Sequence, residues 1–345
     1  MKNENPNILI TGGAGFLGSR IVKELLCDDT PIKPGKISVF DLKAYEGQTD
    51  NKVEIIRGDI RDKNAVEKAC QGIDIVIHCA AIIDWGTRTK EEVLSVNLGG
   101  TKNIIASCKK NRVNNLVFTS SLDAVFSGKP LVNINEDQPY PDAYHTVYCE
   151  SKVLGEKAVL EAGSPDLKTC ILRPSDIYGE ADPYHMDALI DMAKSGFYVR
   201  LGNGTSKCQH VYVGNMAHAH VLAAKALWTD NKKVIQQIYF ISDANGVNFF
   251  KFFDQIVSGA GYKIFPKNVW LPFTLAYAIG SISEFIAVLW RPIKHYNPKF
   301  SRFAVLYTCL DFTFSTRKAI EDFNFQPKYS RKESLQNTIA YYSIK

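Results

Sequence analysis

The sequence predicts an α/β fold, a doubly wound parallel sheet with helices on both faces and a smaller mixed cap from the C-terminal part. Two observations predict this class. In the first half of the 345-residue chain, short β-branched runs alternate with stretches of helical periodicity, as in right-handed βαβ units. A glycine-rich turn, Gly12–Gly18, follows the first run and opens the first helical stretch. A doubly wound parallel sheet of this class begins with a strand, a glycine-rich turn and a helix, in that order.

The first half supplies the predicted strands and helices in turn. Strands are expected over residues 7–11, 36–41, 53–58, 73–79, 115–120 and 168–174. Helices are expected over residues 20–26, 63–69, 93–110 and 151–162, where apolar residues recur at helical spacing.

The alternation weakens after about residue 180, where prolines interrupt an aromatic-rich remainder. We therefore expect residues 1–180 to form the sheet domain and residues 181–345 to form the cap. Segments at about 205–245 are expected to return to the first domain. A substrate would then bind between the sheet and the cap, beyond the carboxyl ends of the strands.

Charge and cysteine content exclude several classes of protein. The net charge of +5 comes from 41 basic and 36 acidic residues spread along the chain, so no basic run predicts nucleic-acid binding. The eight cysteines are scattered without a C-x-x-C pair, which is typical of buried thiols in a reducing compartment and not of a zinc site. Residues 1–7 do not resemble a secretory signal. We expect a cytoplasmic protein without a metal.

The glycine-rich turn predicts a dinucleotide site of the Rossmann type. Gly12, Gly15 and Gly18 give a G-x-x-G-x-x-G spacing around Phe16 and Leu17. Glycine permits the tight turn and lets a pyrophosphate approach the helix N-terminus. The cofactor is expected to contact all five residues.

Acidic residues after the next two strands predict the rest of the dinucleotide site. Asp41 ends the second strand, where a carboxylate accepts hydrogen bonds from the adenosine ribose and repels a 2′-phosphate. This favours NAD over NADP, although the nearby Lys43 leaves NADP open. Asp59 and Ile60 suit the adenine edge; the alternative for Asp59 is that it caps the following helix.

A tyrosine and a lysine four residues apart predict the proton-transfer group. On a helix, Tyr148 and Lys152 fall on one face. The ammonium of Lys152 is expected to lower the pKa of the phenol from its ordinary value of ~10 and to hold the nicotinamide ribose. Ser121, at the end of a strand, is expected to orient the substrate oxygen. We prefer Ser121 to Ser120 because neighbours on a strand point to opposite sides. A buried structural serine is the alternative.

With these motifs in their order, residues 7–180 resemble an extended short-chain dehydrogenase/reductase. The resemblance implies that Ala80, Ala81 and Pro174 line the cofactor site and that Asn97 supports the backbone of the active site. Dehydratases of this family place an Asp-Glu pair after the catalytic hydroxyl residue, whereas Leu122-Asp123 stands here. Epimerases commonly carry an arginine at the position of Cys208, so a nucleotide sugar would lack its charge partner here.

Several stretches instead resemble the 3β-hydroxysteroid dehydrogenase/isomerase family. They are residues 81–86, 127–130, 208–224, 301–305 and 314–319. Within them, His218 and His220 point apart on a helix, so we expect structural roles for both and no metal site.

An apolar helical segment, residues 268–290, predicts an apolar ligand. It contains one charged residue, Glu284. Its apolar residues recur at helical spacing beside a narrow polar strip of Tyr277, Ser281 and Glu284. Three interpretations stay open: a buried or lid helix, a helix on a membrane surface, and a transmembrane span.

The expected function is NAD-dependent oxidation of the 3β-hydroxyl group of a sterol-like alcohol. Tyr148 as a phenolate would take the hydroxyl proton. An isomerase step has no assigned acid/base pair; Asp84 and Tyr178 are candidates for substrate contact, but we prefer structural roles for both. The alternatives are a reductase of long-chain 3-oxo acids, a nucleotide-sugar epimerase and a non-catalytic dinucleotide sensor. A homodimer, as in relatives, and a peripheral membrane contact stay open.

Overall fold

A seven-stranded parallel sheet forms the centre of the molecule. The computed structural model describes residues 4–84, 88–243, 245–290 and 300–343. From one edge to the other, the sheet runs through β3 (Val53–Arg57), β2 (Lys36–Asp41), β1 (Asn7–Thr11), β4 (Ile75–His78), β5 (Asn115–Thr119), β7 (Lys168–Pro174) and β11 (Gln237–Ile241). All of these strands pair in parallel. The predicted doubly wound fold is confirmed.

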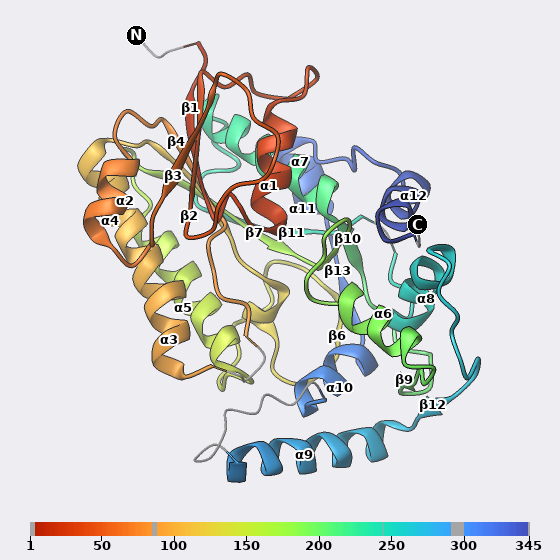
Figure 1. Ribbon diagram of the computed structural model, residues 1–345. Helices are drawn as coiled ribbons and strands as arrows, with labels where there is room; N and C mark the ends of the chain where they lie inside the picture. The colour runs from red at the N-terminus through yellow and green to blue at the C-terminus, as the bar shows by residue number, and fades with distance from the viewer. Residues whose placement is uncertain (1–3, 85–87, 244, 291–299, 344–345) are drawn as a thin grey trace.

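Helices cover both faces of the sheet (Figure 1). One face packs against α1 (Phe16–Leu25), α7 (Val213–Trp228) and α11 (Arg317–Phe323), and the other against α2 (Lys63–Ala69), α4 (Thr101–Asn111) and α5 (Val147–Ala162). The two cores follow the alternation of side chains along each strand. In β1, Ile8 and Ile10 belong to the first core and Leu9 to the second.

The predicted strands of the first half agree with the structure to within two residues at either end. All but the edge strand β3 are mostly buried runs. The predicted helix over residues 93–110 is wrong as a single helix. It consists of α3 (Lys90–Leu94), a π-helical segment Ser95–Gly100 and α4. Gly100, at the end of this segment, allows the side chain of Ile60 to approach closely, and short π-helical turns inside α-helices often lie at functional sites.

The C-terminal part contributes to the sheet and also builds smaller pieces beside it. Strand β11 forms one edge of the central sheet, and α7 packs on one of its faces. The remaining strands form three parallel pairs, β6 (Leu131–Ile134) with β13 (Phe312–Phe314), β8 (Asp176–Tyr178) with β10 (His210–Tyr212), and β9 (Arg200–Leu201) with β12 (Trp270–Leu271). The other helices are α6 (Met186–Lys194), α8 (Phe249–Gly259), α9 (Phe273–Trp290), α10 (Arg302–Cys309) and α12 (Arg331–Tyr342). The division into domains at residue 180 stays a prediction.

A buried ion pair fastens α5 to the sheet. Nε and one terminal nitrogen of Arg173, on β7, donate to the two carboxylate oxygens of Glu156 at 2.8 and 2.7 Å. Tyr140 and Ser120 also donate to Glu156. Both members of the pair are almost fully buried, so each charge depends on the other for compensation.

We predict that Glu156→Gln lowers the free energy of unfolding by about 3–5 kcal/mol, because it leaves the Arg173 guanidinium buried without its counter-charge. Chemical denaturation measures the change. The control is Glu321→Gln, which removes an exposed i,i+4 pair with Arg317 and should cost less than about 1 kcal/mol. Equal losses in the two variants would contradict the importance of the buried pair.

Candidate active site

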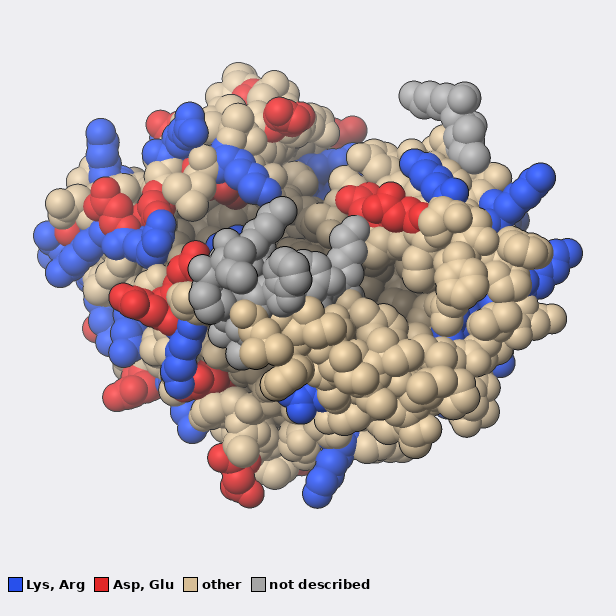
Figure 2. All heavy atoms as spheres, turned by 60° about the horizontal axis from the view of Figure 1, so that its bottom comes forward, with Lys and Arg blue, Asp and Glu red and all other residues tan. Residues whose placement is uncertain are grey.

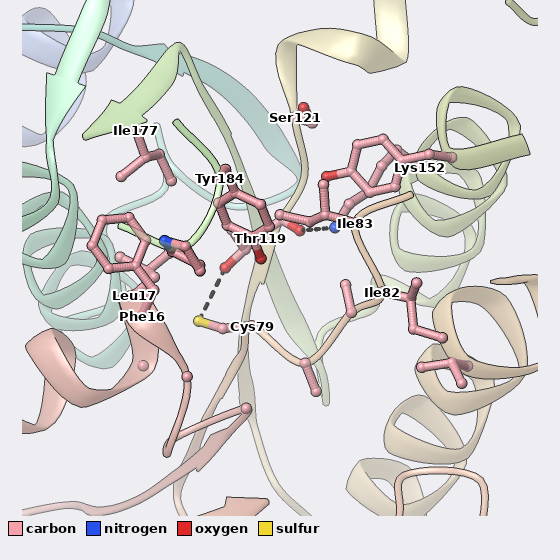
Figure 3. Close-up of a pocket in the computed structure, with 18 of the residues that line it drawn as sticks. Phe16, Leu17, Cys79, Ile82, Ile83, Thr119, Ser121, Lys152, Ile177 and Tyr184 are labelled. Carbon is pink, nitrogen blue, oxygen red and sulfur yellow. Dashed lines mark hydrogen bonds between the residues drawn. The ribbon is translucent and has the colours of Figure 1, made fainter. Parts of the chain in front are cut away.

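A cleft of about 570 Å³ crosses the carboxyl ends of the central strands. It starts at the glycine-rich turn and reaches Tyr184 and His185 before α6 and Tyr307 on α10. Figure 3 shows Phe16 and Leu17 on one side of it and Ile82, Ile83 and Lys152 on the other. This is the edge of the sheet at which open α/β folds bind ligands.

Most of the predicted cofactor residues line this cleft. They are Gly12, Gly15, Phe16, Leu17, Gly18, Asp41, Asp59, Ile60, Ala80, Ala81, Tyr148, Lys152 and Pro174. Asn97 is not among them.

The glycine-rich turn has no room for side chains. Gly12 has a positive φ of 70°, and a Cβ there would lie 2.8 Å from the backbone of Ala80. A Cβ on Gly18 would collide with the carbonyl oxygen of Gly12. Gly15 caps α1, whose first turn contains no acidic residue. The first turn of this helix thus contributes no negative charge of its own against a pyrophosphate at its N–H groups.

The Asp41 carboxylate organises the turn as well as facing the cleft. One of its oxygens accepts from the backbone N–H of Ala14 at 3.0 Å, and the other accepts from that of Lys43 at 2.9 Å. Each carboxylate oxygen can accept a further bond. The residue is thus placed to meet a ribose hydroxyl, while Lys43 also lines the cleft.

Two other predicted residues have partners that the sequence did not indicate. Asp59 pairs with Arg61 at 2.5 Å, and the helix cap that we considered for it is supplied by Asp62. The Asn97 side chain accepts from the N–H of Ile82 at 2.7 Å and donates to its carbonyl oxygen at 2.8 Å. It also donates to Ser151 on α5. Asn97 therefore lies behind the cleft wall and supports it.

Tyr148 and Lys152 both face the cleft from α5. Thr146 caps this helix and so sets its first turn. The ammonium of Lys152 donates to the carbonyl oxygen of Thr119 at 2.9 Å (Figure 3) and lies 5.6 Å from the centre of the Tyr148 ring. Burial lowers the pKa of Lys152 to about 8.

The pKa of Tyr148 differs from the expectation. Burial raises it well above its ordinary value, and the nearby Asp123 raises it further, while a hydrogen bond with Ser121 acts in the opposite direction. In the protein without a bound dinucleotide the pKa of Tyr148 is therefore raised and not lowered, because burial removes hydration from the phenolate; the expected lowering relied on an oxidised nicotinamide as well as on Lys152.

The two neighbouring serines have different partners. Ser120 donates to the buried Glu156, whereas Ser121 donates to Asp123 at 2.6 Å and contacts Tyr148. The side chains thus diverge as strand geometry predicts, and only Ser121 connects with the tyrosine.

Sequence reasoning missed a polar cluster at the far end of the cleft. Asp176 accepts from Tyr307 at 3.0 Å and contacts His185 and His210 at 3.2 and 3.0 Å. Asp176 and Asp182 together raise the pKa of His185 to about 9 despite its burial. No sequence signal could have found this cluster, because its members come from four separated segments that only the fold brings together.

The two weaker candidates for substrate contact lie elsewhere. Asp84 is buried and accepts from the N–H of Arg88 at 3.0 Å. Tyr178 packs edge-on against Phe252 with ring centres 4.8 Å apart and borders a separate, smaller cavity. Neither lines the main cleft. The resembling stretch 81–86 ends in Trp85 and Gly86, which lie outside the described residues.

The two histidines of α7 point to different partners, as expected. His218 pairs with Glu24 at 2.8 Å, and His220 contacts Thr119 at 2.8 Å. In the described part of the chain, no three histidine, cysteine or acidic side chains come close enough to hold a metal ion. Among the same residues, no helix is long and apolar enough to cross a membrane.

Comparisons with known proteins identify the family of the chain. The 3-beta hydroxysteroid dehydrogenase/isomerase family matches residues 9–272. The chain is 33% identical to short-chain dehydrogenase/reductase family 42E member 1 of Macaca fascicularis, over 99% of this chain and 88% of that protein. It is 29% identical to a decarboxylating sterol-4-alpha-carboxylate 3-dehydrogenase of Schizosaccharomyces pombe, over 97% of both chains.

A solved structure supports the fold. The Bordetella bronchiseptica enzyme WbmH, in complex with NAD+, superimposes with a TM-score of 0.73 at 18% identity and covers 98% of both chains. At that identity the likeness is one of fold alone. The sequence matches reach further: the chain belongs to the 3-beta hydroxysteroid dehydrogenase/isomerase family and is an oxidoreductase acting on CH–OH groups.

Proposed function

We propose that this protein oxidises the 3β-hydroxyl group of a sterol-like alcohol with NAD as the oxidant. The observation that carries the proposal is the placement of Tyr148, Lys152 and Ser121 in the same cleft as the glycine-rich turn. A dinucleotide laid along that cleft would have its phosphates at α1 and its reactive end near Tyr148. The cofactor, when bound, accepts the hydride from the carbinol carbon.

The residues of the cleft fit NAD. The crowded turn at Gly12 and the N-terminus of α1, whose first turn has no acidic residue, suit the pyrophosphate. Asp41 suits the adenosine ribose, and its negative charge disfavours a 2′-phosphate. NAD is therefore the proposed cofactor, with NADP the weaker alternative because Lys43 is close.

The polar groups around Tyr148 have separate roles in the proposed reaction. Ser121 orients the substrate oxygen beside Tyr148, and the Tyr148 oxygen takes the proton of the substrate hydroxyl group. The Lys152 ammonium, held by Thr119, supplies positive charge beside the phenol and suits the nicotinamide ribose hydroxyls. Since all three side chains are buried, their contacts are strong and fixed before substrate arrives.

The substrate end of the cleft carries charges of both signs. Asp123 and Asp176 line it together with His185 and Lys152, and His185 pairs with Asp176 at 3.2 Å. These charges do not decide between a 3β-hydroxysterol and a sterol carboxylate, for which the yeast relative is named.

A nucleotide-sugar epimerase and a non-catalytic sensor fit the cleft less well than a sterol dehydrogenase. The position at which epimerases commonly carry an arginine is Cys208, whose buried thiol donates to the carbonyl oxygen of Leu310 and does not line the cleft. A nucleotide diphosphate would lack a guanidinium there. A non-catalytic sensor would have no need for the assembled Ser121, Tyr148 and Lys152.

We further propose that α9 docks on a membrane surface. Its outward side chains are apolar and exposed, from 41% for Ile279 to 64% for Phe285. Its polar strip instead faces the protein, where Glu284 accepts from Nε of Arg302 at 2.6 Å. Figure 1 shows α9 beside α10 and away from the sheet, and Figure 2 shows a broad uncharged area on this side of the molecule. An apolar side turned outwards needs a partner.

An anionic phospholipid surface fits this helix better than a second protein chain. The exposed stripe is one helix wide. The exposed Lys263 and Lys267 lie ten and six residues before α9 in sequence, and Arg302 contacts α9 through its ion pair with Glu284. Basic residues around an apolar stripe attract acidic headgroups. Tyr307 on α10 lines the cleft, so α9 lies one helix away from the proposed sterol site.

The substrate proposal predicts that purified protein reduces NAD with a 3β-hydroxysterol, followed by NADH absorbance. Turnover with a 3α-hydroxysterol should be at least about tenfold lower. Tyr148→Phe should abolish turnover while NAD still binds by calorimetry. Activity only with a nucleotide sugar, or only with NADH and a 3-oxo acid, would refute the proposal.

The two serines provide a matched pair of variants. We expect Ser121→Ala to lower kcat on the order of a hundredfold, because the substrate oxygen and the phenol lose their common hydroxyl partner. Ser120→Ala should mainly lower the melting temperature, because Glu156 loses one donor. If the two variants lost kcat equally, Ser121 would have no special role.

The membrane proposal predicts co-sedimentation with phosphatidylcholine vesicles that contain phosphatidylserine, and weaker binding to phosphatidylcholine alone. The double variant Ile282→Glu/Phe285→Glu should bind at least about tenfold less, because two apolar side chains lose their burial. The control is Ile55→Glu/Tyr341→Glu, which adds the same charges at exposed positions outside α9. Equal binding by both double variants would show that α9 is not the membrane-binding element. A dimer in sedimentation that only the α9 variant dissociates would also refute the membrane proposal, because α9 would then bind a second protein chain.

A further inference from the structure

A buried histidine on α7 reaches the end of β5 from the face of the sheet opposite to α5. His220 is fully enclosed by the protein and does not line the cleft. Its Nε2 lies 2.8 Å from Oγ of Thr119, and its Nδ1 lies 2.8 Å from the carbonyl oxygen of Met216 in the preceding turn of the helix. Thr119 ends β5 and does line the cleft. His220 thus contacts a wall of the site, although the proposed chemistry gives it no role.

The partners of His220 fix the direction of its hydrogen bonds. A carbonyl oxygen can only accept, so Nδ1 carries a proton and donates it to Met216. Burial lowers the pKa of His220 to about 4, so the ring is neutral at pH 7 and Nε2 accepts from the Thr119 hydroxyl group. The same hydroxyl oxygen lies 3.1 Å from Sγ of Cys79. Burial raises the pKa of that thiol to about 12, so the thiol keeps its proton and can donate to the Thr119 oxygen. These bonds hold the Thr119 side chain in one rotamer.

Thr119 joins this histidine to the lysine of the active site. Its carbonyl oxygen accepts from the ammonium of Lys152, on α5, at 2.9 Å, and Figure 3 shows Thr119 between Lys152 and Cys79. These contacts lie where β5 loses its strand partner on one side, because the pairing with β4 ends at His78 and Phe118. Side chains therefore take over the support of the strand end on that side.

Two groups of the reaction centre depend on the position of Thr119. Lys152 is buried, and a buried ammonium needs an acceptor at hydrogen-bond distance, which the Thr119 carbonyl oxygen supplies. Ser121 follows two residues later, where the chain passes from β5 into the 3₁₀ turn Leu122–Val125. A shift of the strand end would move both groups relative to Tyr148, and a misplacement of about 1 Å can cost on the order of a hundredfold in rate.

We propose that His220 is a positioning residue of the active site. By accepting from the Thr119 hydroxyl group, it holds the end of β5 so that the Thr119 carbonyl oxygen keeps the Lys152 ammonium in place. His220 itself contacts neither substrate nor cofactor. It supports the site from the α7 face of the sheet, while the pair of Glu156 and Arg173 holds α5 on the other face. This role rests on the proposed dehydrogenase chemistry.

Three single variants test this role. His220→Leu removes the acceptor, and Thr119→Val removes the donor while it keeps the branched shape of the side chain. Each should lower kcat roughly tenfold and weaken NAD binding in calorimetry, because Lys152 loses its fixed position near the nicotinamide ribose. The KM for the sterol should stay unchanged, because no substrate contact is removed. His220→Gln should recover part of kcat and of NAD affinity, because its amide oxygen can accept from the same hydroxyl group.

The double variant His220→Leu/Thr119→Val shows whether the two residues act as one unit. If His220 acts through Thr119, the double variant should lose about as much kcat and NAD affinity as either single variant. Losses of kcat that multiply to roughly a hundredfold would overturn the proposal, because His220 would then act independently of Thr119. Native kcat and NAD affinity in His220→Leu would overturn it as well.

His218→Gln is the matched control on the same helix. His218 pairs with Glu24 at 2.8 Å and does not line the cleft, so this variant should lower the melting temperature but leave kcat and NAD affinity unchanged. Equal losses of kcat in His218→Gln and His220→Leu would overturn the proposal, because any weakening of α7 would then have the same effect. NAD calorimetry tests the role of His220 without a sterol. The expected binding pattern without turnover of any sterol would support the positioning role and refute the proposed substrate.

Discussion

The active site depends on one buried ion pair, between Glu156 of α5 and Arg173 of β7. The pair sets the rotation of α5 about its axis, and this rotation decides whether Tyr148 and Lys152 face the cleft or the core. Tyr140 and Ser120 bond to the same carboxylate, so the helix is held from several sides. Burying two charges is costly unless their geometry is good. Here the bidentate contact meets that condition and makes α5 a rigid support for the chemistry.

Local sequence predicted the sheet and the dinucleotide turn well. The bounds of β1, β2 and β7 follow from short buried runs, and Gly12 and Gly18 are required by backbone contacts that no side chain would permit. Such features depend on neighbours in the sequence or on the mere absence of a side chain. The π-helical segment at Ser95–Gly100 was missed because apolar spacing does not distinguish a π-helical turn from the α-helix around it.

The electrostatics of the site could not be predicted in the same way. A Tyr-x-x-x-Lys spacing places an ammonium near a phenol, but it does not show how completely both groups are enclosed, and burial determines the pKa of Tyr148. The cluster of Asp176, His185 and Tyr307 joins segments that are remote in sequence. Likewise, helical spacing predicted two sides for α9 but not that the apolar side faces outwards, since this depends on the contact of Glu284 with Arg302.

The protein thus combines a polar reaction centre with an apolar exterior nearby, and the two serve one purpose in our interpretation. Asp123, Asp176 and Tyr307 at the end of the cleft suit the hydroxyl end of a substrate, because an apolar ring system gains nothing from carboxylates. On the proposed function, the apolar part of the sterol would extend past these groups towards α9, the helix that we propose docks on a membrane. A substrate that is polar at one end and apolar over the rest of its length fits both the polar end of the cleft and the apolar exterior. A nucleotide sugar is polar throughout and fits only the polar end of the cleft.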